Sequence, residues 1–119
     1  MPNEAIPVHK LILLYIAGQA PGIRLSRLRD AGLATLSMDY LDLAGALEDL
    51  TASGLIQGTV RDDKLLRDAE DREIEICQLT VAGRSTLQAL ENQIPAPTRR
   101  FLSAYLDETH LQRTAADTI

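Results

Sequence analysis

The chain has 119 residues, an apolar fraction of 45% and a formal net charge of −5, which fits one compact domain with a core of its own. The longest apolar run, residues 11–18, is less than half of the roughly 20 residues that a membrane-spanning helix needs. The N-terminus has no signal-peptide pattern, and the single cysteine, Cys77, permits no internal disulfide. The sequence therefore predicts a cytoplasmic protein without a membrane segment.

Acidic and basic residues are unevenly distributed along the chain. Residues 61–75 contain seven acids and four bases, and no stretch forms the basic stripe that marks nucleic-acid-binding proteins. This charge argues against tight non-specific DNA binding, because that affinity comes mainly from neutralised phosphates. One Phe, three Tyr and no Trp also disfavour a single-strand-binding surface built on base stacking.

The first third of the chain predicts two helices around a short strand. Residues 4–17 carry a wide apolar face, so we expect this helix to be buried on more than one side. The breakers in residues 18–22 end it. Residues 23–24 are long enough for only a single sheet pairing, and a brief helix follows at residues 26–31.

Residues 37–50 predict a third helix, with Ser37 as its cap. Its apolar positions, which we expect to point inward, are Tyr40, Leu43, Leu47 and Leu50. The outward face would then consist of Asp39, Asp42, Gly45, Ala46 and Asp49. Gly54 follows as a left-handed cap.

The second half of the chain changes its periodicity. Residues 55–60 and 73–79 predict two strands, and the charged segment between them is long for a hairpin loop, so we expect it to be mobile at its tip. Thr80 can cap a helix that runs to about Asn92, residues 94–97 break it, and a last helix starts at Thr98. We expect fraying after Thr109.

This element order predicts a mainly α protein with a small β-sheet (α+β), a winged helix-turn-helix with an additional C-terminal helix. The domain would comprise residues 1–109, with a wing at about 55–79 and dimerisation helices at about 80–108. Residues 110–119 would form a tail.

Two phrases of the sequence resemble winged-helix regulators of the PadR and MarR families. "ALEDLTASGLIQG" contains a Leu-x-x-x-Gly-Leu-Ile phrase, and "CQLTVAGRSTLQAL" contains a Leu-Thr-x-x-Gly-Arg phrase. The residues that match are Leu50, Gly54, Leu55, Ile56, Leu79, Thr80, Gly83 and Arg84. "HKLILLYIAGQAPG" and "ENQIPAPTRRFLSAYL" further resemble a bacterial family of unknown function proposed to contain winged-helix regulators. The resemblance covers roughly residues 6–107 and implies a regulator that contacts DNA.

The fold that the chain resembles places its third helix in the DNA major groove. The residues at that position are Ser37, Asp39 and Asp42; an Asp can accept a hydrogen bond from cytosine, but carboxylates also repel phosphates, and a solvated acidic face is the alternative. Phosphate contacts would come from basic residues around the second helix and in the wing. Those candidates are Arg24, Arg27, Arg29, Arg61, Lys64 and Arg67. In the wing, acidic neighbours leave open a self-paired, solvated hairpin.

Other chemistry finds little support in the sequence. His9 and His110 have no metal-ligand spacing around them, and no catalytic grouping or phosphate loop is present, so we expect neither an enzyme nor a cofactor. We interpret Cys77, in a predicted strand, as a small core residue; the alternative is that it acts as a redox sensor.

The apolar inventory predicts a homodimer. Residues 73–79 carry apolar side chains on both faces of a strand, and the last helix carries more of them than a small winged helix needs. The interface candidates are Phe101, Leu102, Tyr105 and Leu106. The resembled fold also commonly dimerises through its terminal helices.

The sequence leaves three functional hypotheses. The first is a dimeric, cytoplasmic winged-helix transcription regulator with weak or partner-dependent binding to double-stranded DNA. The second is a winged-helix interaction module that does not bind DNA and uses its acidic face to meet a basic protein. The third is a small-molecule sensor with a pocket at the dimer seam.

Overall fold

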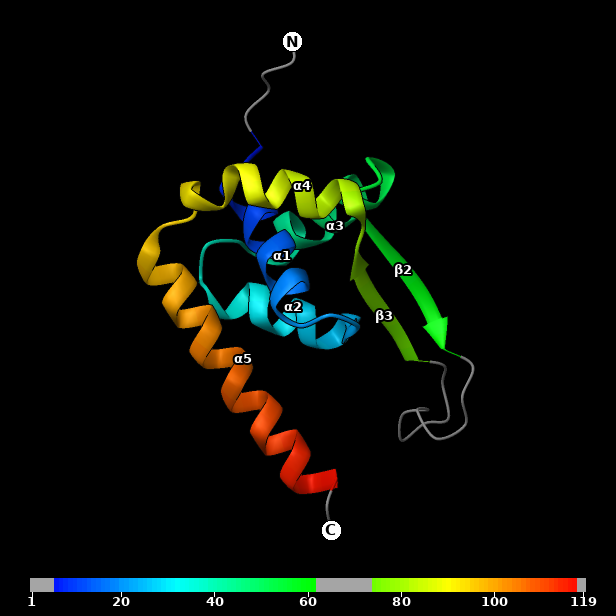
Figure 1. The fold of residues 1–119 in the computed structure, drawn as a ribbon, viewed down its shortest axis with the longest axis vertical. Coiled ribbons are helices and arrows are strands. Elements are labelled where there is room, and N and C mark those ends of the chain that lie inside the picture. Colours follow the sequence, from blue (N-terminus) through cyan, green and yellow to red (C-terminus); the bar gives the residue numbers. More distant parts are fainter. Residues whose placement is uncertain (1–5, 62–73, 118–119) are drawn as a thin grey trace.

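The computed structural model describes residues 6–61 and 74–117, which fold into helices and a small sheet (Figure 1). The helices are α1 (Val8–Gln19), α2 (Leu25–Ala34), α3 (Tyr40–Ala52), α4 (Val81–Leu90), the short 3-10 helix η2 (Glu91–Gln93) and α5 (Ala96–Asp117). The strands are β1 (Ile23–Arg24), β2 (Ile56–Arg61) and β3 (Ile74–Leu79). This composition and order confirm the predicted α+β class and the winged-helix plan.

The sheet is antiparallel, with the strand order β1-β3-β2. Ile23 pairs with Cys77 at one edge, and Ile56 pairs with Leu79 at the other. The short pairing expected for residues 23–24 is thus present, and it places the start of α2 beside the central strand. Residues 62–73, which form most of the predicted wing loop, lie outside the described residues. The mobility expected for this loop therefore stays a prediction.

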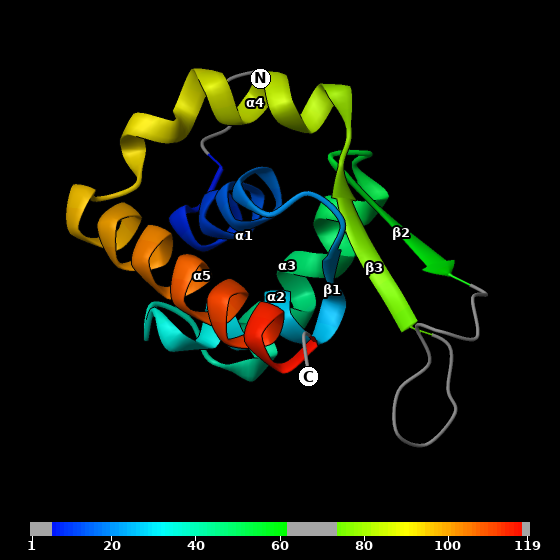
Figure 2. The ribbon, with the colours of Figure 1, turned by 60° about the horizontal axis from the view of Figure 1, so that its bottom comes forward.

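The core is built around α1. All residues from 11 to 17 are buried, and the helix contacts α2, α3, α4, α5 and β3. Figure 2 shows α1 enclosed between α4 on one side and α2 and α5 on the other. A helix that is apolar around its whole circumference is stable only when it is buried on all sides, so the predicted multi-sided burial is confirmed.

The start of α3 differs from the sequence prediction. The cap is Asp39 rather than Ser37: its Oδ1 accepts a hydrogen bond from the Asp42 amide at 2.8 Å, and Asp42 Oδ2 accepts one from the Asp39 amide at 3.4 Å. This reciprocal pair is a capping box. The Ser37 hydroxyl instead donates to the carbonyl of Thr35 at 3.5 Å within the turn.

The inward face of α3 is also rotated relative to the prediction. Leu43 and Leu50 are buried as expected, but Tyr40 is 61% exposed and Ala46, assigned to the outside, is 2% exposed. Positions 43, 46 and 50 share one face at the helical repeat of 3.6 residues. Tyr40 is the first residue of the helix, and its ring remains largely in solvent.

A tight junction joins the end of α3 to the start of α4. Gly54 has φ +76°, which confirms the left-handed cap. The Thr80 hydroxyl donates to the Gly54 carbonyl at 2.7 Å and accepts from the Gly83 amide at 2.9 Å, which confirms Thr80 as the cap of α4. Gly83 lies so close to Leu55 that a β-carbon would overlap the Leu55 carbonyl oxygen.

The C-terminal helices begin and end close to the predicted positions. η2 extends the α4 segment to Gln93, and α5 starts at Ala96 rather than Thr98, because Pro97 is acceptable in a first helical turn. The backbone of α5 stays helical to Asp117, beyond Thr109, where fraying was expected. Among the helices that the structure describes, none is both long and apolar enough to cross a membrane.

Much of the apolar surplus predicted for an interface is buried within the chain. Leu102 is 0% exposed, and Tyr105 and Leu106 pack half-buried against the core. Ile76 and Cys77, on opposite faces of β3, are 7% and 2% exposed. The expectation that Leu102 lacks an intrachain partner is therefore wrong, because α5 folds back onto the body and places Leu102, like Cys77, in the core.

The surroundings of Gly83, in this junction, and of Gly45, on the surface of α3, predict opposite effects of an alanine substitution on stability. Gly83→Ala should lower the free energy of unfolding by about 3 kcal/mol, because the new β-carbon meets a backbone oxygen that has no free direction to move. Gly45→Ala, on the open surface of α3, should raise it by about 0.5–1 kcal/mol. Urea unfolding of both variants measures the difference, and equal effects would contradict the close approach.

Candidate nucleic-acid interface

The helix-turn-helix consists of α2, the turn at residues 35–39 and α3. Thr35 organises the turn: its hydroxyl donates to the Gly32 carbonyl at 2.7 Å and accepts from the Ser37 amide at 3.2 Å. Leu36, between them, has φ +60° and is 90% exposed. The turn therefore presents an apolar side chain to solvent beside the N-terminus of α3.

The N-terminus of α3 carries its own negative charges. Asp39 and Asp42 are both exposed, and each carboxylate accepts a hydrogen bond from the backbone amide of the other residue at this helix end. An uncapped helix N-terminus attracts anions through its free amides and its dipole. In this chain two carboxylates already satisfy that attraction, so the helix end is not prepared for a DNA phosphate.

A third acidic residue of α3 is partly balanced by α1. Lys10 Nζ lies 3.1 Å from Asp49 Oδ2, with the two side chains 24% and 61% exposed. An ion pair this open to solvent contributes under about 1 kcal/mol to stability, but it reduces the charge that Asp49 presents. The acidity of α3 is thus concentrated at Asp39, Asp42 and Glu48, all of them exposed.

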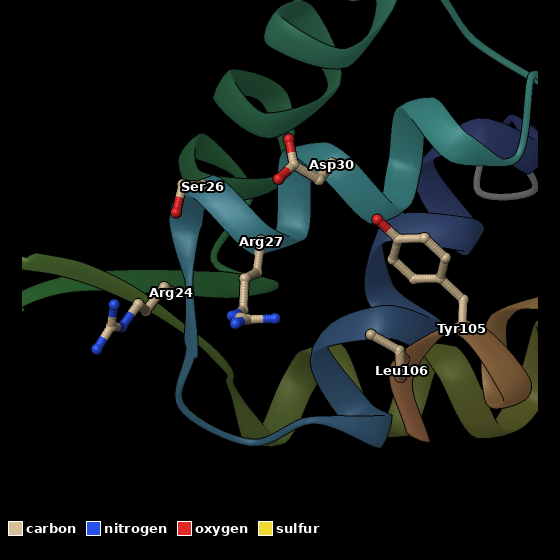
Figure 3. A pocket seen from close by; sticks show the side chains of 6 residues that line it. All are labelled: Arg24, Ser26, Arg27, Asp30, Tyr105 and Leu106. Atoms are coloured by element: carbon tan, nitrogen blue, oxygen red, sulfur yellow. The ribbon is translucent and has the colours of Figure 1, made fainter. Parts of the chain in front are cut away.

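The predicted phosphate-contacting arginines fall into two groups. Arg24 and Arg27 are half-buried and line a pocket of about 300 Å³ with Asp30 and, from α5, Tyr105 and Leu106. Figure 3 shows Arg27 projecting from α2 and the Tyr105 ring projecting from α5 into this pocket. Arg29 is exposed and lies on a different surface, next to α3. The structure therefore brings Arg24 and Arg27 together and separates Arg29 from them.

The wing candidates remain predictions. Arg61 is the last residue of β2, and only its backbone is described, while Lys64 and Arg67 lie outside the described residues. β2, which ends at Arg61, contacts α3 (Figure 1), and the strands beside the third helix are the part of a winged helix that contacts the DNA backbone.

A groove that the sequence did not predict runs between α3 and the sheet. This α3–sheet groove has a volume of about 500 Å³ and is lined on the helix side by Tyr40, Ala44, Leu47, Glu48 and Thr51. Residues of β2 and β3 line the other wall, and Leu25 and Arg29 of α2 also contribute. The feature of the sequence that could have indicated this groove is a pair of small residues, Ala44 on the helix and Gly58 on the strand. They leave space where larger side chains would come into contact.

Cys77 lies in the floor of the groove. The thiol is buried, and desolvation, with a smaller contribution from the Glu75 carboxylate, raises its pKa from 9.0 to about 11. It is therefore protonated at neutral pH and behaves as a small core residue, as the first of the two sequence interpretations has it. Among the described residues, no group of three or more His, Cys, Asp or Glu side chains could hold a metal ion.

The raised pKa predicts how Cys77 reacts. In the folded protein, alkylation by iodoacetamide should stay slow through pH 9 and accelerate only towards pH 11, since the thiolate is the reactive form. In urea the same thiol should accelerate near its ordinary pKa of 9.0. Rates measured by mass spectrometry across this pH range test the shift, and identical profiles in the two states would contradict the burial.

A helix-turn-helix followed by a β-hairpin and two further helices defines a winged-helix protein. The fold is similar to that of a MarR-family transcriptional regulator from Silicibacter pomeroyi, at a TM-score of 0.53 and 18% identity, covering 95% of this chain and 70% of that one. A probable transcriptional regulator from Pseudomonas aeruginosa is similar at a TM-score of 0.52 and 22% sequence identity, and the match covers 99% of this chain and 81% of that one. BpsR of Bordetella bronchiseptica is similar at a TM-score of 0.54 and 16% sequence identity, and the match covers 98% of this chain and 83% of that one. The DNA binding of BpsR is regulated by 6-hydroxynicotinic acid.

Residues 9–119 match the family model described as a domain of unknown function, DUF4364. The chain therefore belongs to this family, and its fold is that of a winged helix. No curated protein matches the sequence.

Proposed function

We propose that the protein is a winged-helix transcription regulator that binds duplex DNA weakly, or only together with a partner. The observation that carries this proposal is the N-terminus of α3, the second helix of the helix-turn-helix, which is capped by two carboxylates of its own. The similarity in fold to MarR-type regulators supports the first half of the proposal. The charge at the helix end supports the second.

The electrostatic cost of this arrangement can be estimated. Two unit charges 4 Å apart in water interact by about 1 kcal/mol, so Asp39 and Asp42 next to phosphates would together oppose binding by about 2 kcal/mol. The basic residues that favour binding lie elsewhere: Arg24, Arg27 and Arg29 on α2 or just before it, and Arg61, Lys64 and Arg67 in the wing. Such contacts fix the position of a protein on DNA without reading its sequence.

Removing the two charges tests the proposal. Asp39→Asn with Asp42→Asn should strengthen binding to random duplex roughly ten- to thirtyfold at low salt, and the gain should fade as salt rises. Asparagine caps helices about as well as aspartate, so the helix itself should be unaffected. Fluorescence anisotropy with labelled duplex at two salt concentrations measures the effect.

A variant with the same change in net charge provides the matched control. Glu91→Lys raises the net charge by two units in η2, which packs on α1 and α4, and should change duplex affinity by less than about twofold, since charges beyond a Debye length are screened. An equal gain in the control and in the Asp39→Asn/Asp42→Asn variant would show that only net charge matters. Sequence-specific binding by the wild type that Asp42→Asn abolishes would show instead that Asp42 reads a base.

A second candidate function is a protein-interaction module for a basic partner. It is favoured by the apolar residues beside the acidic cap: Leu36 is 90% exposed, Leu41 79% and Tyr40 61%. Exposed apolar side chains flanked by polar ones are typical of protein-binding surfaces. Under this function neither the wild type nor the Asp39→Asn/Asp42→Asn variant would bind duplex DNA.

We further propose a homodimer that uses α5. Phe101 is 41% exposed, and its ring centre lies 5.7 Å from that of Tyr105, so an aromatic pair reaches the surface of this helix. Figure 1 shows the C-terminal part of α5 continuing past α2, which leaves helix surface for a second copy.

Two substitutions one residue apart distinguish interface from core. Phe101→Glu should give a folded monomer, because the carboxylate would be buried against the partner copy. Leu102→Glu should unfold the chain, because Leu102 is 0% exposed within the protomer. Sedimentation velocity at micromolar concentration, with circular dichroism on the same samples, measures both; a monomeric wild type would contradict the proposed dimer.

A further inference from the structure

The α3–sheet groove has the size and lining of a small-molecule site. Its volume of about 500 Å³ falls in the range of roughly 300–1,000 Å³ typical of ligand pockets, which combine an apolar lining with a few polar groups. The floor is formed by Leu43, Ile56 and Cys77, whose side chains are 1%, 5% and 2% exposed. A ligand would therefore meet a rigid apolar surface that is already packed from below.

The walls of the groove carry one aromatic ring, and their charged side chains are more acidic than basic. Tyr40 stands at the N-terminal end of the helix wall and is 61% exposed, so its ring can cover an apolar ligand. Glu48 lies on the helix wall and Glu75 on the strand wall, and Arg29 is the one basic residue among the lining side chains that the structure describes. Two carboxylates against one guanidinium give this described lining a net negative charge.

The carboxylates are available to a ligand. Glu48, Glu75 and Arg29 are exposed, and no ion pair joins them to another side chain within residues 6–59 and 75–107, where side chains are described. A carboxylate held beside an apolar floor gains more from a bound cation than one in open water, because the lower local dielectric strengthens the interaction.

The strand wall is shaped to hold one of these carboxylates. A β-carbon on Gly58 would lie 3.2 Å from Glu75 Oε2, which is closer than most such contacts allow. The absence of a side chain at position 58 therefore lets the Glu75 carboxylate lie across the neighbouring strand, on the face of the sheet that lines the groove.

We propose that the α3–sheet groove binds an amphipathic organic cation, with the apolar body of the ligand on the floor and against Tyr40 and its positive charge balanced by Glu48 and Glu75. The two carboxylates disfavour an organic anion. The proposal does not rest on the proposed DNA binding, because every residue that it uses acts on the ligand directly.

A pair of probes that differ in charge tests this site in the full chain. Tetraphenylphosphonium and tetraphenylborate have nearly the same shape and size, and opposite charges. We expect the cation to bind at least tenfold more tightly than the anion at low salt, with an affinity that falls as salt screens the carboxylates. Isothermal titration calorimetry gives the affinities, and amide shifts in NMR spectra should locate the cation at residues of α3, β2 and β3.

Charge variants of the groove should shift the affinity in opposite directions. Glu48→Gln and Glu75→Gln should each weaken tetraphenylphosphonium binding roughly fivefold, and Arg29→Gln should strengthen it by a similar factor, the size of one contact between unit charges in water. Asp107→Asn, an exposed acid on α5 outside the groove, is the matched control and should leave the affinity unchanged. Ala44→Trp, which fills the groove from the exposed side of α3, should abolish binding of both probes.

Four results would overturn the proposal. They are tighter binding of the anion than of the cation, equal effects of Glu48→Gln and Asp107→Asn, full binding by a folded Ala44→Trp variant, and no saturable binding of the cation at millimolar concentration. Because these measurements contain no DNA, the proposed regulator function can fail while the ligand site stands, and the reverse also holds.

Discussion

The close approach of α4 to the end of α3 is the constraint on which the rest of the structure depends. At Gly83 the backbone of α4 meets the Leu55 carbonyl, and Thr80 bonds to both Gly54 and Gly83. These contacts fix the direction in which β2 leaves α3 and β3 returns to α4. The separation of α3 from the sheet, and hence the groove between them, follows from this one packed corner, because strands and helices are rigid over such lengths.

The acidic end of α3 shows how a structural requirement and a binding function compete for the same atoms. A helix that begins in solvent needs partners for its first amides, and Asp39 and Asp42 supply them within the chain. A DNA phosphate would have to displace or tolerate both. Uncharged capping residues meet the structural requirement equally well, so the negative charge is a property of this surface and is not dictated by the fold.

The sequence predicted the elements whose signals are local and missed those that depend on packing between elements. Gly54, Thr80 and the apolar run of α1 carry their own signals: a left-handed residue, a hydroxyl cap and an unbroken apolar face. The cap of α3 was misplaced because Ser37 and Asp39 are both good capping residues, and only the path of the preceding turn decides between them. Leu102 was assigned to a dimer interface because its distance in sequence from α1 conceals their packing. The groove is formed by residues of α3 and of two strands. The periodicity of the sequence predicts each element separately and does not show which surfaces face each other.

The burial of α1 also has a consequence for how such a chain can diverge. Seven consecutive residues, 11 to 17, have almost no exposed surface, so this helix can accept only exchanges that conserve volume. The outer face of α3, with small residues such as Gly45 and Ala44 facing solvent, is under no such restriction. Related chains can therefore keep one frame, fixed by α1, while the surface of α3 drifts in charge and shape, and a single architecture can serve several different partners without refolding.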